Sequence, residues 1–280
     1  MAGDPFRTRD HVSNFDDLVR DYAERSAATR ARHRCIPDVA YGPGPDETLD
    51  LFLPPEPDGP APVHVFVHGG YWRMFDKEDF SFVAETVLAE GAIAAVINYS
   101  LMPGVRLDRI VDQVRRAVRW VAADIERYGG DPAALSVSGH SAGAHLCCWL
   151  LDESFAGGTV KSALLLSGVY DLAPLQASFL QDLIGLTDEE VGRWSPLGAR
   201  FGAGAEVSIL VGERETAPFH EQAGRLADEL ASRNVERRFA VLAGEDHMTA
   251  VRAFGDRKSQ AALELKRVIE TARLAARAGS

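Results

Sequence analysis

The chain has 280 residues and a mass of 30.4 kDa, and its 46% hydrophobic and 25% charged residues are ordinary for a globular protein with one large core. Its formal net charge of −11 disfavours nucleic acid and anionic membranes as partners, because both attract positive surfaces. We therefore expect a small neutral or zwitterionic molecule as the ligand, with no nucleic acid and no membrane as partner.

The first predicted element is an amphipathic helix over residues 13–30. Phe15, Leu18, Val19 and Tyr22 recur at the helical spacing i, i+3, i+4 and i+7. Packing against the main body is the simplest role for this helix. A cover over the mouth of a binding site is the alternative.

From residue 35 the chain reads as strands that alternate with helices. The first two strands, 35–40 and 49–53, are separated by a Gly-Pro-Gly-Pro turn. Six later strands are predicted at 63–67, 92–97, 135–137, 162–166, 207–211 and 238–242. Helices are expected at 80–89, 107–128, 142–151, 219–232 and 259–275. This alternation favours a mostly parallel sheet with helices on both faces, and such sheets bind ligands beyond the carboxyl ends of their strands.

Residues 173–201 break the alternation. The segment carries Phe179, Leu183 and Trp194 among turn residues, and it is too long for a plain connection. We expect a small cap-like helical insertion that walls the binding pocket, with packing at the sheet edge as the alternative. The chain as a whole, 1–280, is interpreted as a single domain.

The motif Gly139-His140-Ser141-Ala142-Gly143 stands between the strand 135–137 and the apolar stretch 142–151. A G-x-S-x-G pattern at such a junction forces a tight turn that holds the serine hydroxyl clear of the sheet. The flanking glycines remove side chains that would clash there. Ser141 is therefore the predicted nucleophile.

A second glycine-rich turn follows the strand 63–67 and reads His68-Gly69-Gly70-Tyr71-Trp72. Turns of this type leave backbone N–H groups directed into a site, where they can bind a developing oxyanion. We expect an oxyanion hole formed by the N–H of Ala142 and by one or two of the N–H groups of Gly69, Gly70 and Tyr71.

A serine hydroxyl needs a base to remove its proton, and the base needs a carboxylate to orient it. His247, after the strand 238–242, is the predicted base. Glu215, after the strand 207–211, is the predicted acid of this catalytic triad, with Glu213 and Asp171 as alternatives.

The remaining histidines and the three cysteines, Cys35, Cys147 and Cys148, lack metal-ligand spacing and a disulfide framework. We therefore expect no metal and no cofactor. The cysteine pattern and the absence of a secretory signal at the first residues favour the cytoplasm.

These motifs together resemble the α/β-hydrolase superfamily, and within it the kynurenine formamidase (arylformamidase) and carboxylesterase group. The resemblance covers most of the chain and is carried by His68-Gly69-Gly70-Tyr71-Trp72, Asn98-Tyr99, Gly130-Asp131-Pro132, Gly139-His140-Ser141-Ala142-Gly143-Ala144-His145-Leu146 and Glu245-Asp246-His247. The aromatic pair Tyr71-Trp72 is its more specific part. The family usually has an aspartate where this chain has Glu215, and either carboxylate can orient a histidine.

The resemblance implies a metal-free serine hydrolase that cleaves aryl formamides or small aryl esters through a covalent acyl-enzyme. Tyr71, Trp72, Tyr99 and Phe179 are the predicted substrate-binding residues. Tyr71, Trp72, Tyr99 and Phe75 are expected beside the glycine turn, where flat apolar side chains would hold an aromatic ring. Aromatic core residues that support the turn are the alternative for these four. A general short-chain carboxylesterase is the alternative, and a non-catalytic ligand-binding protein on the same fold is a further one. The oligomeric state is left open, with a homodimer among the options.

Overall fold

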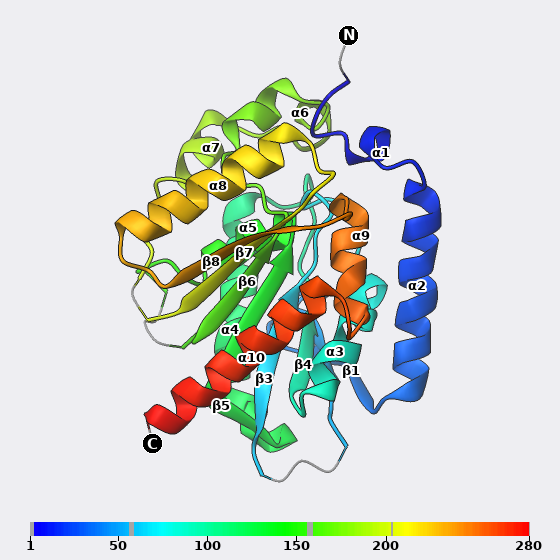
Figure 1. The fold of residues 1–280 in the computed structure, drawn as a ribbon, viewed down its shortest axis with the longest axis vertical. Coiled ribbons are helices and arrows are strands. Elements are labelled where there is room, and N and C mark those ends of the chain that lie inside the picture. Colours follow the sequence, from blue (N-terminus) through cyan, green and yellow to red (C-terminus); the bar gives the residue numbers. More distant parts are fainter. Residues whose placement is uncertain (1–2, 56–58, 156–158, 203, 280) are drawn as a thin grey trace.

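The computed structural model, which describes residues 3–55, 59–155, 159–202 and 204–279, contains an eight-stranded sheet between two layers of helices (Figure 1). The strand order is β1-β2-β4-β3-β5-β6-β7-β8. The strands are β1 (Cys35–Ala40), β2 (Thr48–Phe52), β3 (Ala61–Val67), β4 (Ile93–Ile97), β5 (Gly130–His140), β6 (Ser162–Leu166), β7 (Glu206–Gly212) and β8 (Arg237–Leu242). β3 to β8 run parallel, and only β2 is antiparallel to its neighbours β1 and β4. The predicted mostly parallel sheet is confirmed.

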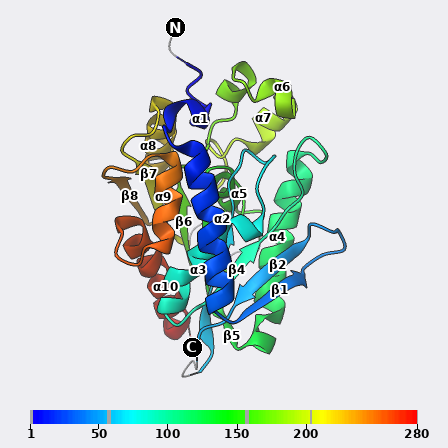
Figure 2. The same ribbon diagram turned by 90° about the vertical axis from the view of Figure 1, so that its right-hand side faces the viewer.

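Helices cover both faces of the sheet. One face packs on α4 (Leu107–Asp124), α5 (Ala142–Cys148) and α8 (Ala217–Ser232). The other packs on α2 (Phe15–Arg32), α3 (Ala84–Ala89), α9 (His247–Arg252) and α10 (Gln260–Ala278). Figure 2 shows α2 running along the outside of this second layer, beside α9 and α3. None of the helices in the described ranges is long and apolar enough to cross a membrane.

The central strands are mostly apolar because both of their faces are buried. In β3, Val63, Val65 and Val67 belong to the core beneath α4, whereas Phe66 belongs to the core beneath α10. The side chains of β6 alternate in the same way. β8 is different, because it ends the sheet and Phe239 and Val241 remain 45% and 42% exposed.

Several element boundaries differ from the predicted ones. β5 begins at Gly130, because Gly130 pairs with Ala61 of β3. No local sequence pattern predicts this pairing. The helix predicted at 80–89 starts as the 3₁₀ helix η1 (Lys77–Val83), whose N-terminus is capped by Asp76. The short helix α1 (Thr8–His11) was not predicted, and the apolar stretch after Ser141 is α-helical only as far as Cys148.

The predicted insertion is helical and contains η3 (Ala173–Ala177), α6 (Gln181–Ile184) and α7 (Asp188–Trp194). Arg106, just before α4, holds it in place. The Arg106 guanidinium donates to the carbonyls of Ile184 and Gly185 at 2.8 Å each and pairs with the Glu190 carboxylate. The segment is thus fixed against the carboxyl end of the sheet. That the whole chain is one domain stays a prediction.

Buried histidines lead to a first prediction, which concerns stability in acid. His64, His68, His140 and His145 are at most 4% exposed. Burial lowers the pKa of His64 to about 3, that of His68 and His145 to about 4, and that of His140 well below its ordinary value. Below about pH 6.5 the unfolded chain binds protons that the folded protein excludes, so each histidine lowers the free energy of unfolding by up to about 1.4 kcal/mol per pH unit.

Urea unfolding curves measured between pH 7.5 and pH 5 should therefore show a steep fall in unfolding free energy as the pH decreases. Replacing the exposed His11 by Gln should leave the slope unchanged. A flat pH dependence over this range would contradict the burial of these neutral imidazoles.

Candidate active site

Ser141 lies in the turn between β5 and α5, with φ 55° and ψ −117°. A non-glycine residue rarely adopts this backbone conformation, which costs of order 1–3 kcal/mol and is typical of functional sites. The same geometry is expected of a serine on a sharp strand-to-helix turn. Ser141 is 2% exposed and lines a cavity with a volume of about 520 Å³.

The two glycines of the motif are required by close backbone contacts. A Cβ atom added at Gly143 would lie 2.0 Å from the carbonyl oxygen of Val67, and one at Gly139 would lie 2.3 Å from the carbonyl of Gly143. Real Cβ atoms do not approach other atoms so closely. The turn can therefore form only with glycine at these two positions.

His247 and Glu215 are joined by a hydrogen bond. The Nδ1 atom of His247 lies 2.7 Å from Oε2 of Glu215. Because a carboxylate only accepts, Nδ1 carries the proton and Nε2 is left with its lone pair. The His247 ring packs between the rings of Phe219 and His140, with centroid distances of 4.6 Å to each. The imidazole is thus fixed in its tautomer and its orientation.

The Glu215 carboxylate is fully buried and receives two further hydrogen bonds. The backbone N–H of Gly212 donates to Oε1 at 2.7 Å, and the hydroxyl of Ser167 donates to the same oxygen. The alternative acids point elsewhere. Glu213 accepts from the N–H of Gly244 at 2.7 Å, and Asp171 pairs with Arg225 at 3.1 Å. Of the three candidates, only Glu215 contacts His247 among the described residues.

Ser141 and His247 line the same cavity, and a hydrogen bond joins the residue before Ser141 to the backbone of His247. The Nε2 atom of His140, the residue before the serine, donates to the carbonyl of His247 at 2.9 Å. Across the described residues, no hydrogen bond joins the Ser141 hydroxyl to the imidazole. Such bonds are commonly long in unliganded sites and tighten when substrate binds.

The glycine turn after β3 passes directly beside the serine. A Cβ atom at Gly69 would lie 3.2 Å from the Cβ of Ser141. Gly70 has φ +107°, and the N–H groups of Arg73 and Met74 donate to its carbonyl at 3.0 and 3.1 Å, which closes the turn. The N–H of Ala142 is the first of α5 and has no acceptor within the helix. The backbone donors expected of an oxyanion hole therefore lie around Ser141.

Two of the predicted substrate-binding residues lie in the core instead of the cavity. Trp72 is completely buried, and its Nε1–H donates to Nδ1 of His145 at 3.2 Å. Tyr99 is 1% exposed, and its hydroxyl donates to the carbonyl of His68 at 2.9 Å. Neither side chain lines the cavity, and both bind groups behind the glycine turn, so this structure favours a supporting role for them over direct contact with a substrate.

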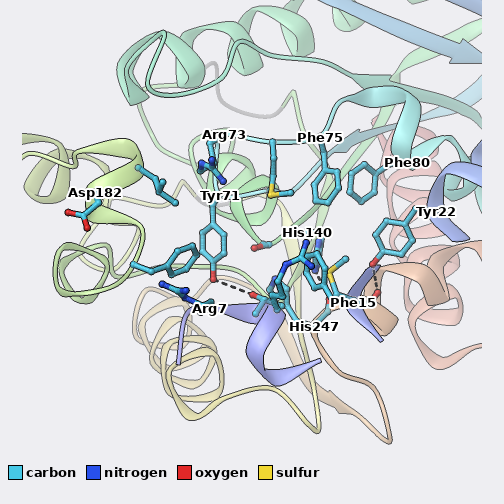
Figure 3. A pocket seen from close by; sticks show the side chains of 18 residues that line it. Arg7, Phe15, Tyr22, Tyr71, Arg73, Phe75, Phe80, His140, Asp182 and His247 are labelled. Atoms are coloured by element: carbon cyan, nitrogen blue, oxygen red, sulfur yellow. Dashed lines mark hydrogen bonds between the residues drawn. The ribbon is translucent and has the colours of Figure 1, made fainter. Parts of the chain in front are cut away.

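The same cavity is lined by six Phe and Tyr side chains, together with polar, charged and aliphatic residues. Tyr71 and Phe179, the other two predicted substrate-binding residues, both line it and meet edge to face at 5.9 Å. Figure 3 shows His140 and His247 between an aromatic side and a more polar side of the cavity. Residues of the aromatic side that the sequence did not reveal are Tyr22 of α2 and Phe80 of η1.

The amino-terminal residues close one wall of the site, which the sequence analysis missed. The hydroxyl of Tyr71 donates to the carbonyl of Phe6 at 2.5 Å, and the Phe6 ring packs on Phe219 at 6.1 Å. Phe15 and Tyr22 show that α2 also contributes to the cavity. The helix therefore packs on the main body and also lines the cavity, whereas a role as a cover over its mouth stays a prediction.

Comparison with known proteins identifies the family. A kynurenine formamidase from Danio rerio is 30% identical over 256 residues, which cover 86% of this chain and 85% of that protein. The chain belongs to the kynurenine formamidase family. A kynurenine formamidase from Salmo salar is 32% identical over 194 residues, covering 66% of this chain and 65% of that one. Residues 49–152 also match the family model BD-FAE.

Solved structures confirm the α/β-hydrolase fold of this kynurenine formamidase family member. A candidate thioesterase from Silicibacter sp. TM1040 superposes with a TM-score of 0.81 at 28% identity, covering 96% of this chain and 98% of that one. An esterase from Pyrobaculum calidifontis gives a TM-score of 0.72 at 18% identity, covering 94% and 93% of the two chains. The BD-FAE match includes the glycine turn and Ser141, whereas Glu215 and His247 lie beyond it.

The backbone contacts at the serine turn give a second prediction. Gly143→Ala should lower the free energy of unfolding by at least about 2 kcal/mol, because the added methyl overlaps the Val67 carbonyl. Gly224→Ala, in the interior of α8 with no atom within 4 Å of the new methyl, should raise it by about 0.5–1 kcal/mol. Denaturant unfolding of both variants measures the difference. Equal stability of the two proteins would rule out the close contact.

Proposed function

We propose that this member of the kynurenine formamidase family is a serine hydrolase that cleaves small aryl formamides or aryl esters. The observation that carries the proposal is the 2.7 Å hydrogen bond between Nδ1 of His247 and the buried carboxylate of Glu215. This bond leaves Nε2 as a base in the cavity that the strained Ser141 also lines.

The proposed reaction has two halves. The Ser141 oxygen attacks the carbonyl carbon while its proton passes to Nε2 of His247. The imidazolium then protonates the leaving nitrogen or oxygen, the bond to the carbonyl carbon breaks, and a formyl- or acyl-serine remains. Water, deprotonated by the same imidazole, attacks this ester and regenerates Ser141. Glu215 stabilises the imidazolium in both halves through its charge and its fixed orientation.

Negative charge on the carbonyl oxygen would be bound by backbone N–H groups. The N–H of Ala142 and the N–H groups of the turn formed by Gly69, Gly70 and Tyr71 lie on either side of the serine, and this arrangement supports their assignment to an oxyanion hole. One such donor typically contributes about 3 kcal/mol to transition-state stabilisation. Nucleophile, base and oxyanion donors all come from the chain itself, so we propose a reaction that needs no metal.

The aromatic lining of the cavity favours an aryl group in the substrate. A formyl group needs almost no space beside the serine, which agrees with the formamidases among the relatives. The cavity volume of about 520 Å³ also leaves room for a larger acyl group. A short-chain aryl esterase is therefore the second candidate, and an esterase of Mycobacterium tuberculosis that is 36% identical over 149 residues favours it.

A third prediction tests the catalytic residues. Ser141→Ala and Glu215→Gln should each lower kcat by at least about 10⁴-fold. The first removes the nucleophile. The second removes the carboxylate that keeps the proton on Nδ1 of His247 and so leaves Nε2 free to act as the base. Hydrolysis of 4-nitrophenyl acetate and of formanilide measures the loss. Circular dichroism would check that each variant is folded.

Glu213→Gln and Asp171→Asn are the matched controls, because these carboxylates bind Gly244 and Arg225 instead of His247. Both should retain kcat within about threefold, as expected for surface substitutions. A Ser141→Ala protein as active as the parent would refute the proposed nucleophile. Equal losses in the Glu215 and Glu213 variants would refute the proposed acid.

A fourth prediction separates the two substrate classes. N-formyl aromatic amides should give a higher kcat/KM than the acetyl and butyryl amides of the same amines. A formyl group has no acyl chain that must fit against the cavity wall. The parallel series of formate, acetate and butyrate aryl esters, assayed with a metal chelator present, completes the panel. A preference for butyrate over formate esters would favour the esterase. Loss of activity with the chelator would contradict a metal-free reaction.

A further inference from the structure

The carboxyl end of β6 lies between the strands that lead to the nucleophile and to the acid. β6 pairs with β5, which precedes Ser141, and with β7, which precedes Glu215 (Figure 1). The last residue of β6, Leu166, accepts the backbone N–H of Ser141 at 2.9 Å. The next residue, Ser167, donates its own N–H to the carbonyl of Leu210 in β7 at 2.8 Å. Residues 166 and 167 thus connect the nucleophile turn to the strand before the acid.

The Ser167 hydroxyl is bound to the proposed acid. Ser167 is 1% exposed, and its hydroxyl donates to Oε1 of Glu215, the same oxygen that accepts the N–H of Gly212 at 2.7 Å. Oε2 is left for Nδ1 of His247. The carboxylate is fully buried, and no lysine or arginine of the described ranges pairs with it. A buried charge needs hydrogen bonds that replace its lost water, and here two donors on one oxygen also direct the other oxygen to the histidine.

The backbone of Ser167 is strained. Its φ is 54°, in the left-handed region that favours glycine and that a serine occupies at a cost. Glycine would adopt this conformation more easily, but it would offer no hydroxyl to Glu215. Strain at a buried residue whose side chain binds a catalytic group is typical of functional sites.

We propose that Ser167 is a positioning residue for the reaction, because its hydroxyl keeps the Glu215 carboxylate oriented and charged opposite the His247 imidazole. The imidazolium forms only when the proton leaves Ser141, so a well-placed carboxylate lowers the energy of the transition state more than that of the bound substrate. Ser167 is not among the residues that line the cavity, so it acts through Glu215 and not on the substrate. The proposal rests on the function proposed above and adds one residue to its mechanism.

Ser167→Ala removes the hydroxyl and keeps the backbone strain. Its kcat for 4-nitrophenyl acetate and for formanilide should fall about 10- to 100-fold, as expected for the loss of one hydrogen bond to a charged group. KM should stay within about twofold of the parent value, because the contacts with bound substrate are unchanged.

Ser162→Ala is the matched control. Ser162 lies on the same strand and is equally buried, and its hydroxyl donates to the carbonyl of Val268 at 2.6 Å, away from the proposed triad. This variant should unfold at a lower urea concentration than the parent, because the Val268 carbonyl loses its donor, and it should keep the parent kcat.

Ser167→Gly separates the role of the hydroxyl from that of the backbone. It should lose as much kcat as Ser167→Ala but unfold at a higher urea concentration, because glycine adopts a positive φ without strain. Activity would then follow the hydroxyl, and stability would follow the backbone. A kcat within about threefold of the parent in both variants, or activity that follows stability, would overturn the proposal.

Ser167→Ala in the Glu215→Gln protein shows whether the two side chains act as a unit. Because Ser167 acts through the carboxylate, kcat should fall by less than about threefold in this background. A loss as large as in the parent protein would refute the proposal. Parent-like Ser167 variants beside an inactive Ser141→Ala protein would refute the role of Ser167 alone, whereas a fully active Ser141→Ala protein would refute the proposed function and the role of Ser167 with it.

Discussion

The approach of Gly143 to the carbonyl of Val67 is the contact on which the active-site arrangement depends. It joins the first turn of α5 to the carboxyl end of β3, where Val67 is already in register with Gly139 of β5. The serine turn and the glycine turn after β3 are therefore in direct contact through their backbones, and the bond from Trp72 to His145 adds a side-chain link between them. The strained conformation of Ser141 persists because this packing leaves no space for a relaxed turn.

The acid and the base are positioned by a second set of backbone contacts, between the loops after β7 and β8. The N–H of Glu213 donates to the carbonyl of Leu242 at 2.9 Å, and that of Arg214 to the carbonyl of Glu245 at 2.9 Å. A Cβ atom at Gly212 would meet the Glu245 carbonyl oxygen at 2.7 Å, so glycine is required here too. The backbones of the loops that carry Glu215 and His247 are thus hydrogen-bonded to each other, in addition to the bond between the two side chains.

Local sequence patterns predict the features that local physics decides. Apolar runs gave the central strands, and strand ends followed by glycine, serine or an acidic pair gave the positions of Ser141 and His247. In a turn with positive φ, the direction of a side chain is determined by tertiary packing and not by the local sequence. Trp72, with φ 58°, points into the core for this reason, although its neighbour Tyr71 lines the cavity. Ser167 escaped notice in the same way, since only the folded sheet brings it to Glu215.

The amino-terminal segment shows why specificity can be separated from catalysis in this fold. Its backbone carbonyls at Pro5 and Phe6 accept from Thr216 and Tyr71 at 2.7 and 2.5 Å, and its Asp4 carboxylate accepts from the N–H of Phe179 at 2.5 Å. These bonds connect the acid loop, the glycine turn and the helical insertion without involving the side chains of the proposed triad. Arg7 of the same segment lines the cavity, as does Phe179 of the helical insertion. The wall of the cavity is therefore joined to the acid loop and the glycine turn by bonds that are separate from the backbone contacts holding Ser141, Glu215 and His247.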